Sequence, residues 1–386
     1  TADRVVWSEQ GRLHLAYTGT VTVATSVIDI TAHAGTNATY VAGSHGLRVG
    51  DTVLVAASAG ASVTIPCRVT AVSTDDVTCL PYTQGHITEF SVTDGAAVTV
   101  LKYGSEWAKG SDTPYTTANE PDFMSFTNKP VIIRDMYHVS GSDVSSVGWV
   151  EVSGEEGQNG YLWYLKAEGD TRARFADNCE MTCLEGVSID NDTTLDTQTL
   201  GGALPQGGTQ GLFDAVKTRG NSTSGVTGVN ASTDLAEFDA ILAEFDKQGA
   251  GGTSYGVFNN SEDMALNLGF SGFRRGSYDF YKSDFRYLND LATRGGINSV
   301  AGASAIRGVI IPAGTSTVYD QNLGKNLKRP FLHVRYRASQ TDDRRLKTWV
   351  TGSVGAATSA LDAMQVHMLS ERCLITQGAN NFMLMK

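Results

Sequence analysis

The sequence predicts an α+β protein that contains a small β-barrel. Residues 20–103 alternate apolar and polar residues at the two-residue period of strands, with turn signals between five or six short runs. Two later stretches, 158–186 and 234–247, instead repeat apolar residues at helical spacing. The chain then returns to strand-type alternation near its carboxyl end. We therefore expect one closed barrel beside a larger mixed region.

The composition excludes two broad classes of function. Charged residues make up 18% of the 386 residues, below the usual quarter, which is typical of a chain that hides surface against partners. The formal net charge of -11 argues against a protein that coats nucleic acid, because neutralising phosphates needs a basic excess. No apolar run reaches the length of about eighteen residues that a spanning helix needs, so we expect no membrane contact.

The block 20–103 consists largely of Val, Thr, Ala, Gly and Ser. Val63, Ile65, Cys67 and Val69 alternate, as inward-facing positions of a strand do. The number and length of such runs predict a small barrel in the size class of SH3 and OB domains.

The cysteines do not predict a metal site. The five cysteines are an odd, scattered set, which favours a reducing compartment. Cys67 and Cys79 could face each other across a hairpin and form a disulfide, or remain free. Cys179 and Cys183 lie four apart on the expected helix, but zinc would need two further ligands, so buried helix cysteines are the favoured interpretation.

The regions outside the barrel are predicted in turn. Residues 1–19 read as an arm whose Trp7, Leu13 and Leu15 have no partner in their own segment, which indicates anchors for another subunit. Residues 104–157 read as a long hairpin. Its two extended stretches, 131–134 and 147–152, flank a tip at 140–143.

The second half of the chain is predicted to hold a further short helix at 261–268, after long loops over 190–232. A β-hairpin is expected over 331–351, and 361–374 is ambiguous between helix and strand. The hairpin is rich in arginine, which favours inter-subunit or intra-chain ion pairs over DNA contacts. Its candidate subunit-contact residues are Arg335, Arg337, Arg344 and Arg345.

No catalytic, cofactor or metal site is predicted, and we expect the protein not to be an enzyme. Gly252 to Gly256 match the nucleophile-elbow pattern, but a glycine-rich loop stands where the strand before the serine should be. Asp190 to Asp196 resemble a calcium loop faintly and lack its distal glutamate.

The order of segments resembles one family, the major capsid proteins of tailed double-stranded DNA bacteriophages with the Hong Kong 97-type fold. Three stretches also resemble those proteins in amino-acid sequence: Gly308 to Thr315, Arg329 to Arg337, and Gln365 to Glu371. The family's self-crosslinking triad of Lys, Asn and Glu cannot be matched here residue by residue.

The resemblance implies a division of the chain. It assigns an N-terminal arm to 1–19 and an extended loop to 104–157, with 20–103 as an inserted barrel domain. A peripheral domain with a long spine helix would then comprise 158–200 and 328–352. An axial domain would comprise 201–327 and 353–386.

The resemblance also implies a function. The chain would be a virion protein, assembled in the cytoplasm of a bacterial host into hexamers and pentamers of an icosahedral shell. Its partners would be other copies of itself, with portal, scaffold and decoration proteins, and packaged DNA contacted on the inner face without sequence specificity. The alternative is a β-rich tail or adhesin-type protein with a carbohydrate-binding barrel. That function would predict aromatic stripes on a block that has only Tyr40, Tyr82, Phe90 and Tyr103.

Overall fold

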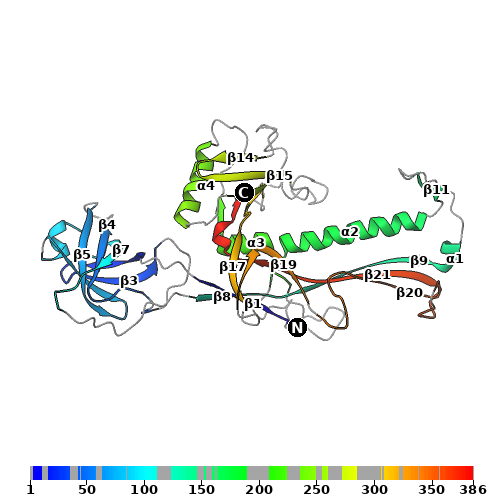
Figure 1. Ribbon diagram of the computed structural model, residues 1–386, viewed down its shortest axis with the longest axis horizontal. Helices are drawn as coiled ribbons and strands as arrows, with labels where there is room; N and C mark the ends of the chain where they lie inside the picture. The colour runs from blue at the N-terminus through cyan, green and yellow to red at the C-terminus, as the bar shows by residue number, and fades with distance from the viewer. Residues whose placement is uncertain are drawn as a thin grey trace. The chain divides into compact units, whose positions relative to one another are not determined.

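The computed structural model places the chain in two compact units. Unit 1 is Thr1–Trp7 with Ser125–Lys386, and unit 2 is Ser8–Met124 (Figure 1). The structure describes residues 3–10, 16–34, 42–43, 45–57, 63–83, 85–110, 123–145, 152–153, 159–160, 163–188, 208–223, 235–248, 254–259, 272–284, 306, 308–320, 325–337, 339–355 and 357–385.

Unit 2 contains a closed six-stranded barrel, which confirms the predicted small β-barrel. Every pairing around it is antiparallel, in the order β2-β3-β6-β5-β4-β7. The strands are β2 (Ala16–Thr22), β3 (Val27–His33), β4 (Asp51–Ala57), β5 (Val63–Ser73), β6 (Asp76–Pro81) and β7 (Ala97–Ser105).

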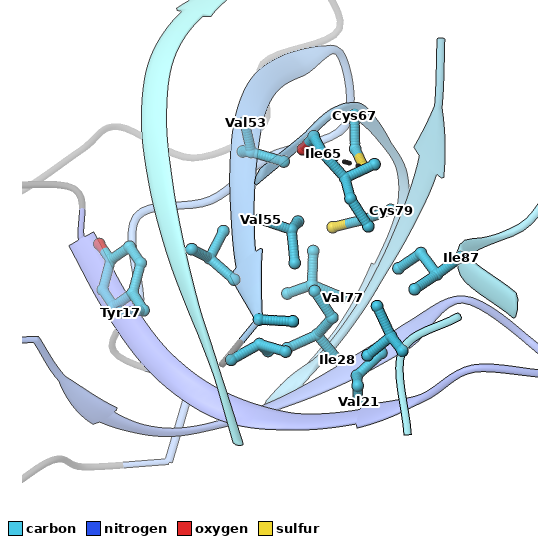
Figure 2. Close-up of a cluster of buried hydrophobic side chains, with 14 of the residues drawn as sticks. Tyr17, Val21, Ile28, Val53, Val55, Ile65, Cys67, Val77, Cys79 and Ile87 are labelled. Atoms are coloured by element: carbon cyan, nitrogen blue, oxygen red, sulfur yellow. Dashed lines mark hydrogen bonds between the residues drawn. The ribbon is translucent and has the colours of Figure 1, made fainter. Parts of the chain in front are cut away.

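The barrel encloses a core of small branched side chains (Figure 2). Val53, Val55 and Ile65 have no exposed surface, and Ile87 of the 3-10 helix η1 (Ile87–Phe90) packs into the same cluster. Alternate positions point inward because side chains of a strand alternate between faces. Closure also leaves none of the six strands with an unpaired edge.

The barrel begins earlier than the sequence predicted. Ala16 pairs with Leu101 and Tyr17 with Val100, so the end of the expected arm belongs to β2. Tyr17 is 2% exposed and its hydroxyl accepts a hydrogen bond from the Gly46 amide at 2.7 Å. The prediction ended the arm at residue 19 because the alternation before Val21 was short, whereas pairing with β7 extends the strand.

The cysteines Cys67 and Cys79 are free thiols inside this core, so the disulfide alternative is wrong. The register sets Cys67 opposite Pro81 and Cys79 opposite Val69, so the two are diagonal neighbours. Burial raises the pKa of Cys67 to about 12 and raises that of Cys79 as well. Thiols held protonated in this way are poor nucleophiles.

Unit 1 is built on a sheet of long strands with one covering helix. β21 (Ala363–Thr376) is its central strand, β9 (Val131–Ser140) pairs along one edge, and β19 (Leu332–Tyr336) and β20 (Lys347–Gly352) pair along the other. The helix α2 (Trp163–Glu185) runs along this sheet in Figure 1 and packs Phe175 and Cys179 on Val366 and Met368. α2 is the long helix expected over 158–186.

The predicted hairpin over 331–351 is wrong. β19 pairs with residues 372–376 and β20 with residues 364–369, so these two strands lie end to end on β21 and do not pair with each other. β9 likewise pairs with β21, and its expected partner 147–152 lies mostly outside the described residues. This error has one cause: most of β21 falls in the stretch 361–374, which was ambiguous, and a nearby strand is the default partner when the true one is far along the chain.

A second, six-stranded sheet has the order β12-β22-β16-β13-β15-β14. Helix α4 (Leu235–Gln248), which was predicted at 234–247, packs Phe245 on this sheet. Helix α3 (Leu212–Arg219) buries Phe213 against other side chains of the same sheet and against α2. The strands are β12 (Asn221–Thr223), β13 (Ser254–Asn259), β14 (Gly272–Arg275), β15 (Tyr278–Asp284), β16 (Gly308–Pro312) and β22 (Met383–Met385).

The remaining elements are short. They are β1 (Val5–Gln10) paired with β8 (Phe123–Asn128), β10 (Val152–Ser153) paired with β11 (Asn159–Gly160), β17 (Thr315–Asp320) paired with β18 (Lys325–Pro330), helix α1 (Gly141–Ser145) at the expected hairpin tip, and the 3-10 helix η3 (Ala379–Asn381). Helix α3 falls within the expected loops over 190–232. The expected helix at 261–268 lies outside the described residues.

The last segment divides between the two sheets. The sequence placed 353–386 in the axial region, but β21 is the centre of the four-stranded sheet, and only the residues after it join the six-stranded one. No helix among the described residues is long and apolar enough to cross a membrane.

Candidate functional site

Two of the four predicted arginines, Arg337 and Arg344, pair with one buried carboxylate, that of Glu371 on β21. Glu371 is 2% exposed although it lies in the middle of an apolar strand. Arg337 donates from Nη1 to Glu371 Oε1 at 3.0 Å, and Arg344 donates from Nε to Oε2. A buried carboxylate is costly unless it is paired, and here each oxygen has its own guanidinium.

Arg337 of this cluster also contacts Asp3, near the first residue of the sequence. Arg337 Nη1 also lies 2.7 Å from Asp3 Oδ1, so one nitrogen serves two carboxylates. The hydrogen bonds to Glu371 and then to Asp3 raise the pKa of Arg337. Asp3 is largely exposed, so its contact is worth at most about 1 kcal/mol.

Backbone contacts complete the cluster. The Glu371 amide donates to the Arg344 carbonyl at 2.8 Å, and the Ser370 hydroxyl donates to the Arg345 carbonyl at 2.7 Å. The segment between β19 and β20 is thereby fixed to β21. Lys347, the first residue of β20, lies 2.6 Å from Asp342 of that segment and holds the pKa of this carboxyl below its usual range through their hydrogen bond.

Arg335 contacts a histidine, and Arg345 contacts an aromatic ring. Arg335 Nε lies 3.4 Å from His333 Nε2, while His333 Nδ1 lies 3.0 Å from the Pro330 carbonyl. These two contacts together indicate a neutral ring with its proton on Nδ1, and burial lowers the pKa of His333 in agreement. The guanidinium of Arg345 lies over the ring of Tyr336, at 5.3 Å from its centroid.

Trp7 is buried against its own chain. It is 6% exposed and packs with Cys373 and Ile375 of β21, and its ring centroid lies 6.2 Å from that of Phe126. The guanidinium of Arg219 lies over both rings. The expectation that Trp7 lacks a partner therefore holds only within its own segment. The other two expected anchors, Leu13 and Leu15, lie outside the described residues.

Sequence reasoning missed the residues that organise this region. Glu371 is the chief omission, and the signal was available, since Ser370 to Arg372 place polar groups inside an apolar run. Asn128 is the second. It is 2% exposed, its Nδ2 donates to the carbonyls of Gln210 and Leu374, and its Oδ1 accepts from the Gln210 amide. A side chain that joins three segments distant in sequence leaves no local pattern.

The surface of the four-stranded sheet carries many uncovered apolar side chains. Of fifteen large hydrophobic residues exposed in the described part of the chain, six lie on its strands or directly before β20. They are Ile132, Met136, Val334, Tyr336, Leu346 and Val350.

Within the described ranges no group of three or more His, Cys, Asp or Glu side chains could hold a metal ion. Burial raises the pKa of Cys179 and Cys183 and raises that of Cys373 to about 12, which agrees with the interpretation of inert buried thiols.

Comparison with known proteins finds similarity in structure and none in sequence. No protein-family model matches the chain, and no curated protein matches it. The capsid structure of cyanophage P-SCSP1u is 9% identical, with 74% of this chain and 80% of that chain covered and a TM-score of 0.40. This chain is similar to phage capsid proteins.

Other solved structures give the same result. A chain of Microbacterium phage Oxtober96 is 8% identical, with 88% of this chain and 87% of that chain covered and a TM-score of 0.39. The capsid of the native GTA particle is 14% identical, with coverages of 73% and 80% and a TM-score of 0.35. The relation is thus one of remote structural similarity, consistent with the absence of any sequence match.

Proposed function

We propose that this protein is a structural subunit of a phage capsid that assembles into hexamers and pentamers of an icosahedral shell around double-stranded DNA. The observation that supports this most is the uncovered apolar surface of the four-stranded sheet. Exposed apolar side chains gathered on one element favour contact with other molecules. Ile132 and Met136 lie on the face away from α2, whereas Val334 and Val350 lie on the face on which α2 packs, so both faces of this sheet favour completion by neighbouring chains.

The arrangement of α2 supports the same proposal. The helix packs on β9 and β21, while Val334 and Val350 of the two outer strands remain more than a third exposed. The outer edges of β9, β19 and β20 have no partner strand among the described residues. Open edges with apolar side chains beside them favour pairing with other chains.

The finer parts of the proposal follow the resemblance. The residues before β2 act as the arm, and those between β7 and α2 act as the extended loop between subunits in a Hong Kong 97-type fold, with α2 as the spine helix. Arg335 and Arg345 are proposed subunit contacts, whereas Arg337 and Arg344 already pair with Glu371. The shell binds portal, scaffold and decoration proteins and contacts DNA without sequence specificity. We propose no catalytic role.

Particle formation tests this function. The purified full chain should sediment as closed particles or as assemblies of five and six subunits, and electron microscopy should show shells. Val350→Ser should lower particle yield, with Val187→Ser as the matched control, because Val187 is a 58% exposed valine outside the sheet. A chain that stays monomeric at every concentration and salt condition contradicts the proposal.

A further inference from the structure

The barrel concentrates its exposed apolar side chains in one region. The four large hydrophobic residues of the described barrel unit that are exposed between Ala16 and Ser105 belong to β7 or to the segments beside β4 and β6. They are Val49, Tyr82, Leu101 and Tyr103, which are 47%, 48%, 40% and 55% exposed. The barrel core is closed without them, so folding gives no reason for their exposure.

Pairing in the barrel places these residues on or beside strands that are consecutive around it, in the order β6, β5, β4 and β7. The amide of Tyr82 donates to the Pro66 carbonyl on β5, and Pro66 pairs with Leu54, which pairs in turn with Leu101. Tyr103 is the extra residue of a bulge between Thr52 and Val53 of β4. Bulges commonly redirect a side chain at functional surfaces.

Tyr82 is held in place before any ligand arrives. Its hydroxyl donates to Glu106 Oε2 at 2.6 Å, and this hydrogen bond raises the pKa of Tyr82 to about 12. Arg68 pairs with Leu80 of β6 and with Thr52 of β4, so it lies on the strand next to the one that ends before Tyr82. A ring fixed in this way loses little conformational entropy on binding.

We infer that this surface, formed by Tyr82, Leu101, Tyr103, Glu106 and Arg68, binds a polysaccharide chain. A sugar ring has an apolar C–H face and a rim of hydroxyls, and an exposed tyrosine ring offers the matching flat apolar surface. Glu106 is a carboxylate with about four acceptor positions, of which Tyr82 uses one. The guanidinium of Arg68 supplies donors on the same surface.

Two other partner classes fit less well. Single-stranded nucleic acid also stacks on aromatic side chains, but it needs a positive channel, and here Glu106 lies within the patch of a chain with net charge -11. A stable protein interface takes about 20–30 residues a side, whereas this patch has four exposed large apolar residues. One or two sugar units match the size of two rings.

Affinity electrophoresis of the full-length protein tests the inference. The probes are soluble β-glucan, dextran and galactomannan cast into native gels. At least one should retard the protein, and Tyr103→Ala should weaken that binding about tenfold, as expected for loss of a ring contact. Tyr82→Phe keeps the ring and loses its hydroxyl, so it should weaken binding by a smaller factor. Tyr281→Ala, at a tyrosine 58% exposed in unit 1, is the matched control and should bind normally.

Each contrary outcome is distinct. Migration unaffected by all three polymers, or equal retardation of wild type and Tyr103→Ala, overturns the inference. Loss of concentration-dependent self-association in Tyr103→Ala would instead identify a protein interface. Loss of particles in Tyr103→Ala would identify a subunit contact and also overturn it. The inference goes beyond the shell function, since wild-type particle formation is read separately from glycan binding.

Discussion

The barrel of unit 2 and the four-stranded sheet of unit 1 differ in how many of their strand edges are paired and in how much apolar surface they bury. The barrel pairs both edges of all six strands and buries a core whose Val53 and Ile65 are fully covered. The sheet covers one face with α2 and leaves residues such as Ile132 and Val350 exposed, with three strand edges open among the described residues. A closed element is complete in one chain, whereas an open one favours completion by other chains.

The largest expected effect is a cavity in the barrel. Ile65→Ala removes a fully buried side chain, so the barrel should lose about 3 kcal/mol of unfolding free energy. Hydrogen exchange of peptides from 63–73 should report the loss, and peptides from α2 serve as the internal control. Unchanged protection in both regions would mean that the barrel core is not close-packed.

The next effect concerns the buried carboxylate in the sheet. Glu371→Gln leaves Arg337 and Arg344 without their shared anion, and should cost about 2 kcal/mol, because both arginines are partly exposed to water. Urea unfolding followed by fluorescence measures it. Asp3→Asn is the control, since Asp3 is 85% exposed, and it should change the free energy by less than about 0.5 kcal/mol.

A smaller effect is expected from alkaline pH. Cys67 has a pKa of about 12 in the folded chain against 9.0 ordinarily, so the folded state favours the protonated thiol. Its contribution to stability is complete below pH 9 and falls as pH rises toward the folded value. About 1 kcal/mol should be lost by pH 10. Cys67→Ala should show a flatter dependence between pH 8 and pH 10; an equally steep one would refute the assignment.

The smallest effect on stability is the most informative for assembly. Ile132→Ala removes the same side chain as Ile65→Ala, but from a position that is 43% exposed, so unfolding should change by less than about 0.5 kcal/mol. Particle yield, measured by sedimentation, should nevertheless fall. Normal yield would remove Ile132 from the proposed subunit contact and weaken the contrast between the two regions.

Local patterns determined the elements that depend on neighbours in sequence. The barrel strands followed from alternation such as that of Val63 to Val69, and α2 and α4 from apolar residues at helical spacing. Helix α3 was not predicted, because eight residues are too few for a clear periodic signal and they follow a stretch rich in Gly and Thr.

Long-range pairing was decided only by the tertiary structure. β21 joins β9, β19 and β20, whose residues lie up to 241 positions away in sequence, as for Arg372 and Val131. The sequence therefore predicted a local hairpin over 331–351 in place of two strands that pair with one shared central strand. The partners of Glu371 and Trp7 depend on the same pairing. Side-chain pattern reports which face of a strand is buried, but backbone hydrogen bonds are alike for every residue, so the identity of the neighbouring strand is settled by packing of the whole chain.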